Sequence, residues 1–230
     1  MRTKPGIVLQ ARLNSTRLRA KALEPVGGRT IVEQCLRRLI AAGVGPVILA
    51  TTWQTEDDAL EAIARRVGVD VLRGSTEDVL ARLLAASERF QIDPVVRALG
   101  DSPAVDVQAP WRVLHALETT GADYVREDGL PLGAGVEAMT QRALRRAAHV
   151  ATEPFDREHA TTLFIRRRDL FHCVKLEAPH ACVAPALNLS VDTSDDLTRV
   201  RELFFRVRSS DPSVPALIAA ARQAAWAGSC

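Results

Sequence analysis

The sequence of 230 residues predicts an α/β domain with a mainly parallel central sheet. Short apolar runs alternate with longer stretches whose apolar residues recur at three- and four-residue steps, which is the pattern of β-α-β units. The composition, 47% hydrophobic and 25% charged, is that of a globular protein with a sizeable core. We therefore expect one domain over residues 1–210, followed by a helical tail, 211–230, that packs on the domain or on a second subunit.

The first half of the chain predicts four strands separated by three helices. Gly43 and Gly45 end the first helix, because glycine is favoured just past a helix C-terminus. Ser75 is the expected N-cap of the third helix, and Asp78 completes an acidic variant of a capping box. The expected strands are 6–11, 47–50, 69–72 and 94–99, and the expected helices are 30–42, 56–67 and 76–89.

The second half of the chain has shorter elements and a loop rich in Gly and Pro over 128–135. Thr193 is the expected N-cap of a helix because its hydroxyl precedes an amphipathic stretch. The expected helices are 109–119, 140–149, 157–166, 194–207 and 215–227, and the expected strands are 123–125, 136–139, 171–176 and 186–191.

The charge balance excludes several classes of function. The chain carries 30 basic and 28 acidic residues, and aromatic residues make up only 4%. Nucleic-acid binding is therefore disfavoured, since neither a global positive charge nor many stacking platforms are present. No apolar run reaches the roughly 18 residues needed to span a bilayer, and the first four residues lead directly into a strand. We expect a cytoplasmic protein.

The four cysteines are Cys35, Cys173, Cys182 and Cys230, and they form no CxxC pair. The positions of His172 and His180 near Cys173 leave a zinc site as an alternative. The irregular spacing favours ordinary reduced thiols instead.

The strongest local signal is the segment 10–23, QARLNSTRLRAKAL, which follows the first expected strand. Ligands of open α/β sheets lie beyond the carboxyl ends of the strands, and a loop there with cations, hydroxyls and free N–H groups suits a polyphosphate. The glycines of Walker and dinucleotide motifs are absent, which excludes both. The alternative is a solvated basic loop. The polar groups of this loop are Arg12, Ser15, Thr16, Arg17, Arg19 and Lys21.

Two aspartates follow expected strands at the same edge. Asp101 comes after Gly100 in RALGDSP, and Asp192 comes after 186–191. Mg²⁺ commonly takes one or two protein carboxylates and completes its shell with water and phosphate oxygens. The pair therefore fits a site for a metal–triphosphate complex. The alternative for Asp192 is that it only caps the helix that follows.

With these residues in view, the chain resembles the cytidylyltransferase family, which includes the spore-coat polysaccharide, 3-deoxy-manno-octulosonate and acylneuraminate enzymes, and it is most similar to the spore-coat branch. The resemblance extends from Gly6 to about Arg206. It rests on QARLNSTRL with Lys21, RGSTEDVLAR (73–82), RALGDSPAVD (97–106), REHAT (157–161) and SVDTSDDL (190–197).

The resemblance implies a three-layer α/β/α nucleotidyltransferase fold, Rossmann-like and similar to the nucleotide-diphospho-sugar transferases. It also implies CTP and an acidic sugar or similar acceptor as substrates, Mg²⁺ as cofactor, and a homodimer. The implied triphosphate ligands are Arg12, Ser15, Arg17 and Lys21, and the implied metal ligands are Asp101 and Asp192. The implied nucleoside neighbours are Arg73, Gly74, Ser75 and Asp78, and the implied acceptor residues are Glu137, Arg157, Glu158 and His159. For His159 a packing or capping role is the alternative.

Two positions depart from the family pattern. The family usually has Pro-Gly where this chain has Arg19-Ala20, which changes the dihedral angles open to the loop and adds a cation. Gly135 stands where an acid is common, which suggests a different acceptor or weaker activity.

The chemistry implied is in-line attack of an acceptor oxygen on the α-phosphorus of CTP, with pyrophosphate leaving. A glycosyltransferase of the same fold is one alternative, although Asp101-Ser102-Pro103 is not a DxD triplet. A nucleotide-binding module without turnover is the other.

Overall fold

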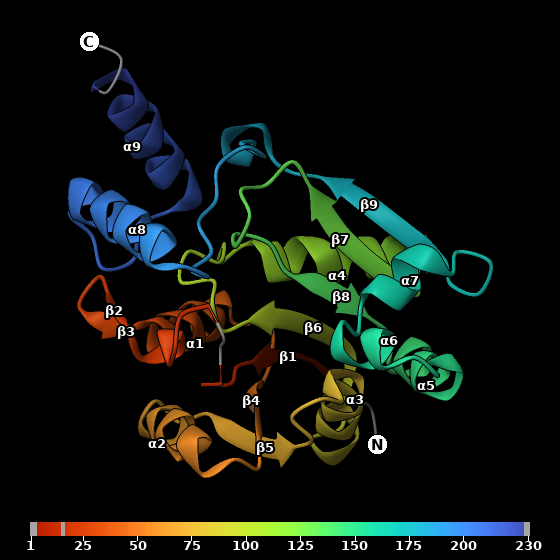
Figure 1. Cartoon of the computed structure of the whole chain (residues 1–230). Coiled ribbons are helices and arrows are strands. Elements are labelled where there is room, and N and C mark those ends of the chain that lie inside the picture. Colours follow the sequence, from red (N-terminus) through yellow and green to blue (C-terminus); the bar gives the residue numbers. More distant parts are fainter. Residues whose placement is uncertain (1–3, 15–16, 228–230) are drawn as a thin grey trace.

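A seven-stranded sheet forms the centre of the molecule, in the order β5-β4-β1-β6-β8-β7-β9 (Figure 1). The computed structural model describes residues 4–14 and 17–227. β5, β4, β1 and β6 are mutually parallel, whereas β8 runs antiparallel to β6 and to β7. The predicted α/β fold with a mainly parallel sheet is confirmed. The strands are β1 Lys4–Gln10, β4 Val47–Thr52, β5 Asp70–Gly74, β6 Ile92–Leu99, β7 Tyr124–Asp128, β8 Glu137–Met139 and β9 Cys173–Glu177, with a separate pair β2 Pro25–Val26 and β3 Arg29–Thr30.

Helices cover both faces of the sheet, which confirms the predicted three-layer architecture. α1, α2 and α4 pack on one face, and α3, α5 and α6 pack on the other. The helices are α1 Ile31–Ala42, α2 Asp58–Arg66, α3 Val79–Arg89, α4 Ala109–Thr120, α5 Gln141–Val150, α6 Pro154–Glu158, α7 Thr162–Arg166, α8 Ser194–Val207 and α9 Val214–Ala227, with short 3-10 helices η1 Lys21–Leu23, η2 Thr55–Asp57 and η3 His180–Cys182.

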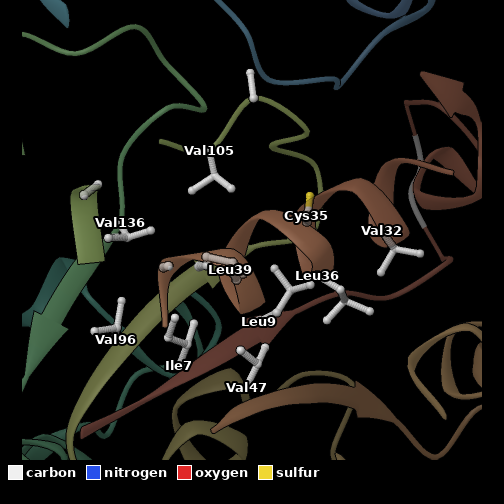
Figure 2. Packing of buried hydrophobic residues seen from close by; sticks show 14 of the residues in the cluster. Ile7, Leu9, Val32, Cys35, Leu36, Leu39, Val47, Val96, Val105 and Val136 are labelled. Carbon is white, nitrogen blue, oxygen red and sulfur yellow. The ribbon is translucent and has the colours of Figure 1, made fainter. Parts of the chain in front are cut away.

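β1 is buried on both faces, and this fixes the strand from which the basic loop emerges. Ile7 and Leu9 face α1, where they lie close to Leu36 and Leu39 (Figure 2). Val8, between them, faces the other way and belongs to the core under α3. Successive side chains of a strand point to opposite faces, so an unbroken apolar run marks a strand that is covered twice.

Two expected helix boundaries are wrong. Ser75 does not cap the third helix, because α3 begins at Val79 and its N-cap is Asp78, which accepts a hydrogen bond from the Ala81 N–H at 2.8 Å. The Ser75 hydroxyl accepts from the Asp78 N–H and closes the preceding turn. The expected helix 157–166 is two short helices, α6 and α7, since the chain turns at the α6 C-cap, His159.

The expected strand 186–191 is also wrong, and the correction concerns the site directly. This segment makes only a single bridge, between Leu132 and Asn188. Gly133 packs so closely that a side chain there would lie 2.5 Å from the Ser190 nitrogen. Asp192 nevertheless reaches the edge of the sheet, because the Val191 N–H donates to the Asp101 carbonyl at 2.8 Å.

The C-terminal helices extend from the side of the sheet that carries α1 (Figure 1). Thr193 caps α8, as predicted, and Asp196 completes a capping box with it. α9 packs on α8 and η3 and buries Val214, Leu217 and Ile218. Within residues 4–14 and 17–227, no helix has the length and apolar character required to cross a membrane.

Candidate active site

The loop that leaves β1 is anchored to the core by a buried aspartate. Asp57 is 1% exposed and accepts hydrogen bonds from the Leu13 N–H at 2.8 Å and from the hydroxyls of Thr51 and Thr52. Further along the loop, Ala20 adopts the left-handed conformation with φ 52°. Ala20 therefore keeps the left-handed backbone conformation that favours glycine, although it has a Cβ. Ser15 lies outside the described residues.

The loop delivers Lys21 to the two aspartates. Its Nζ lies 2.6 Å from Asp192 Oδ1 and 3.1 Å from Asp101 Oδ2. Arg17 contacts the same Asp192 oxygen at 2.9 Å. Asp101 follows β6 and Gly100, and Gly100 is required there because a Cβ would lie 2.6 Å from that of Ala11. Residues from three distant segments thus converge at the carboxyl edge of the sheet, as the sequence predicts.

Asp192 is held in place by the helix that follows it. Its N–H donates to Asp196 Oδ2 at 3.1 Å, and the Thr193 N–H donates to the same oxygen. Burial raises the pKa of Asp196, but hydrogen bonds from Arg199, Thr193 and the backbone outweigh it and lower this pKa to about 2. Because Thr193 is the N-cap, the alternative role of Asp192 as a helix cap is wrong. The Asp192 carboxylate is left to face Lys21.

The aspartate pair has the donor chemistry of a magnesium site. Both side chains are about one-quarter exposed, and both already converge on one cation, the Lys21 ammonium. Two hard carboxylate oxygens are what Mg²⁺ commonly takes from a protein when phosphate and water supply the rest. Among the described residues, no group of three or more His, Cys, Asp or Glu side chains is placed to hold a metal. The residues present therefore fit an ion shared with a phosphate ligand.

A first cleft of about 330 Å³ opens beside these residues. Arg12 crosses it, donating to the Thr76 carbonyl at 2.9 Å and to Glu158 Oε1 at 3.0 Å. His159 also lines it and packs against Phe155 with ring centroids 4.4 Å apart. The expected triphosphate residues that the structure describes thus share one cleft with Glu158 and His159. They are Arg12, Arg17 and Lys21.

A second cleft of about 440 Å³ adjoins the first at Asp101 and Asp192. Glu137 lines it and accepts hydrogen bonds from Arg97 at 2.6 Å and from the Tyr124 hydroxyl at 2.5 Å. Burial, together with the neighbouring Glu137 carboxylate, raises the pKa of Tyr124, so its hydroxyl stays a donor. The expected acceptor residues are therefore divided, with Glu137 in the second cleft and Glu158 and His159 in the first.

The remaining predicted residues line neither cleft and bind other parts of the protein. Arg73 donates to the carbonyls of Thr52 and Gln54 and pairs with Asp58. Arg157 binds Asp78 at 2.7 Å, and Gly74 leaves room for the Arg82 side chain. Five predicted residues are absent from the described lining of both clefts. They are Arg73, Gly74, Ser75, Asp78 and Arg157.

Sequence reasoning missed two arginines of the site. Arg97 donates hydrogen bonds to Gln10 Oε1 at 2.7 Å and to Glu137 Oε2, and it lines both clefts. Arg82 is 3% exposed and donates to the Thr76 carbonyl. The sequence contained a signal for each, because a charged residue within an apolar strand, or on the buried face of a helix, requires a polar partner.

Comparison with protein families and curated proteins gives a consistent result. The family described as cytidylyltransferase matches residues 6–203. The spore coat polysaccharide biosynthesis protein SpsF of Bacillus subtilis is 31% identical over 204 residues, which cover 86% of this chain and 85% of that protein. An uncharacterized protein of Methanocaldococcus jannaschii is 34% identical over 197 residues, which cover 85% of this chain and 81% of that protein.

Solved structures agree with this result. A cytidylyltransferase from Leptospira borgpetersenii superposes with a TM-score of 0.89 at 28% identity, covering 96% of this chain and 95% of that one. A CMP:2-keto-3-deoxy-manno-octonic acid synthetase complexed with CTP has a TM-score of 0.69 at 18% identity, covering 88% of this chain and 99% of that one. The second likeness concerns the fold alone.

Proposed function

This chain belongs to the cytidylyltransferase family and is a nucleotidyltransferase, and we propose that it transfers CMP from CTP to an acidic sugar or a similar acceptor with the help of Mg²⁺. One observation carries the proposal. Lys21 lies between Asp101 and Asp192 at the sheet edge where Arg12 and Arg17 also converge. A site that holds two carboxylates and several cations together can bind a metal and a polyphosphate at once.

The proposed reaction is a single displacement at phosphorus. The hydroxyl oxygen of the acceptor attacks the α-phosphorus of CTP and its proton passes to solvent. A new O–P bond forms, and the bond from the α-phosphorus to the oxygen that bridges the α- and β-phosphates breaks to release pyrophosphate. Arg12, Arg17 and Lys21 bind the phosphates and neutralise the charge that develops on the leaving pyrophosphate. Such chemistry depends on positioning and electrostatics, because the protein forms no covalent bond itself.

Asp101 and Asp192 would hold Mg²⁺ in this proposal. The ion, when bound, supplies positive charge to phosphate oxygens. Lys21 would then exchange its carboxylate partners for phosphate oxygens, since it cannot stay between the two aspartates when a metal lies there. A relative supports an acidic sugar as acceptor, because a protein of Chelativorans that is 29% identical to this chain is a 3-deoxy-manno-octulosonate cytidylyltransferase.

The other predicted residues have roles in the same proposal. Ser15 would join the triphosphate ligands, and the second cleft would take the acceptor against Glu137. Glu158 and His159 would close over the junction of the two substrates. Arg157 and the segment 73–78 would shape the nucleoside side of the first cleft through Arg12 and Asp78.

The donor can be tested by thermal shift. We expect CTP to raise the melting temperature more than UTP, GTP, ATP or dTTP, and Mg²⁺ to enlarge the effect. Ligand at a hundredfold excess over Kd stabilises a protein by about 2.7 kcal/mol, which is readily measured. If no triphosphate shifts the melting curve, the proposed function is wrong.

The metal site can be tested by pyrophosphate release with 3-deoxy-manno-octulosonate as acceptor. We expect Asp101→Asn to abolish turnover and leave the melting temperature within a few degrees of the wild type. Asp169→Asn serves as the control, since Asp169 is an exposed carboxylate paired with Arg167 away from both clefts. Full activity of Asp101→Asn would contradict the assignment.

The proposal includes a homodimer, with residues 1–210 as the catalytic unit and 211–230 as a tail that packs on it or on a second subunit. In the described chain α9 already contacts α8 and η3 of its own domain. Light scattering of the full chain beside a variant truncated after residue 210 separates the two. A dimer lost on truncation would assign the tail to the subunit contact.

A further inference from the structure

A row of charged side chains crosses the sheet beside the second cleft. The pairing of β6, β8 and β7 places Arg97 opposite Glu137 and Glu137 opposite Arg126. The next strand, β9, adds Lys175 opposite Arg126. Residues directly opposite each other on paired strands project to the same face, so these four side chains stand side by side.

Glu137 is already engaged by its other neighbours. Its Oε2 accepts from Arg97 at 2.6 Å, and its Oε1 accepts from the Tyr124 hydroxyl. At the far end of the row, Lys175 lies 3.5 Å from Asp128. Arg126 therefore has acids nearby, but each already has a partner. Within the described residues, Arg126 forms no ion pair and no side-chain hydrogen bond.

Arg126 lies among paired charges in the second cleft. The acidic residues that line this cleft all have cationic partners within the protein: Glu137 pairs with Arg97, Glu127 with Arg112, Asp128 with Lys175, and Asp101 and Asp192 share Lys21. Arg126 lines the same cleft, and among the described residues it has no acidic partner of its own. Guanidinium groups bind carboxylate and phosphate oxygens through paired, charge-assisted hydrogen bonds.

We propose that Arg126 determines acceptor specificity by binding an anionic group, a carboxylate or a phosphate, of an acceptor held in the second cleft. The inference rests on the proposed function, because the acceptor oxygen must reach the end of the cleft formed by Asp101 and Asp192. The volume of about 440 Å³ is within the range of small-molecule sites. The charge of the acceptor then complements the guanidinium of Arg126, which has no acidic partner among the described residues.

The test is calorimetric titration of the full chain with matched probes. The anions are 3-deoxy-manno-octulosonate and glycerol 3-phosphate, and the uncharged counterparts are mannose and glycerol. Each is titrated into the free protein and into the protein with Mg²⁺ and α,β-methylene-CTP, an analogue that resists transfer. We expect at least one anion to bind and its uncharged counterpart to bind at least about tenfold more weakly, the loss expected for a charge-assisted hydrogen bond.

Variants identify the residue responsible. Arg126→Gln should weaken anion binding at least about tenfold, and Arg126→Lys should restore part of it because the charge remains. Lys175→Gln is the matched control, since Lys175 is the neighbouring cation of the same row and already has Asp128 as a partner. It should leave anion binding unchanged. The melting temperature and the CTP-induced shift of Arg126→Gln should equal those of the wild type.

A second variant tests Arg126 by adding a carboxylate to the second cleft. Gly135 lines the second cleft, and a Cβ there would meet only the end of the Leu130 side chain, at 3.3 Å. Gly135→Asp should place a carboxylate in the cleft and compete with the acceptor's anionic group, which weakens anion binding while CTP binding persists.

The outcomes separate this inference from the proposed function. Binding of octulosonate alone assigns the site to a carboxylate, and binding of glycerol 3-phosphate alone assigns it to a phosphate. Equal affinity of an anion for the wild type and Arg126→Gln would overturn the inference, and so would failure of both anions to bind the wild type in either state. Absence of a CTP-induced shift would instead overturn the proposed donor, whatever the anion titrations show.

Discussion

The two halves of the central sheet carry their charged residues in different places. In the parallel half, β5-β4-β1, β4 is buried along its whole length, and the cations Arg12, Arg17 and Lys21 lie on the loop that follows the end of β1. In the mixed half, β6-β8-β7-β9, charged side chains lie within the strands themselves, as Arg97, Glu137 and Arg126 do. The parallel half therefore presents its chemistry on loops, and the mixed half presents it on the sheet face.

This difference separates what each half contributes to stability and to binding. A cation on a loop can change partners without disturbing the core, as Lys21 must do when a phosphate arrives. Removal of one member of a charge pair within the strands leaves the other charge without a partner. We expect variants of the loop in the parallel half to lose turnover, and variants that break the Arg97–Glu137 pair of the mixed half to lose stability together with acceptor binding.

The largest effect is expected for Lys21→Met. Turnover should fall about 10²–10³-fold, as is typical when one group that stabilises developing charge is removed. The melting temperature should fall less than in Arg97→Leu, because Arg17 still contacts Asp192 and the Ser102 hydroxyl still donates to Asp101. Pyrophosphate-release kinetics and a thermal melt measure the two quantities. A large loss of stability would contradict the comparison.

Arg97→Leu should act in the opposite way. It leaves Glu137 largely buried without its cation, which we expect to cost about 2–4 kcal/mol of unfolding free energy. Thermal or urea unfolding measures this loss. Arg167→Gln, which breaks an exposed pair with Asp169, is the control and should cost at most about 0.5 kcal/mol. The double variant Arg97→Leu with Glu137→Leu should recover part of the stability.

Asp196→Asn tests the link between the capping box and Asp192. The variant should lose about 1 kcal/mol of stability at neutral pH, as expected for a weakened helix cap. The pKa of Asp196 is lowered to about 2 from an ordinary 3.8, so its stabilising contribution is present above pH 3.8 and is lost as the pH falls towards 2. Unfolding measured between pH 2 and 7 should show a flatter acid limb in the variant.

The smallest effect is expected for Ala20→Gly. The left-handed conformation costs a non-glycine residue about 1–2 kcal/mol, and glycine's greater freedom in the unfolded chain offsets part of the gain. We expect the variant to be more stable by about 0.5 kcal/mol. Gly43→Ala is the matched test, because Gly43 has φ 66° with open space around it, and it should lose about 1 kcal/mol. Differential scanning calorimetry resolves both.

The sequence predicted the parallel half well because its signals are local. Apolar periodicity marks each strand and helix, and the polar groups of the site lie next to the strand that positions them. The direction of β8 was not predicted, since Glu137–Met139 is three residues long and carries no signal of direction. The segment 186–191 was mistaken for a strand because Leu189 and Val191 are buried in the main core, and the spacing of buried residues does not show whether a segment pairs with neighbouring strands.

The charges of the mixed half were only partly predicted for a related reason. Glu137 was identified through resemblance, but Arg97 and Arg126 become its neighbours only through strand register. Register depends on pairing between segments that are distant along the chain, and no short window of sequence contains both partners. Helix α8 was predicted correctly because Thr193 and Asp196 form a cap within four residues.

The bridge between Leu132 and Asn188, with Gly133 against the Ser190 backbone, has a consequence for protein engineering. The loop that borders the second cleft and the segment that ends at Asp192 are packed against each other, although the bridged residues Leu132 and Asn188 are far apart along the chain. A graft of residues 129–136 from a homologue, intended to import a new acceptor preference, would carry only one of these two segments. Recombination should therefore exchange 129–136 and 184–192 together, so that the imported loop keeps the segment against which it packs in the homologue.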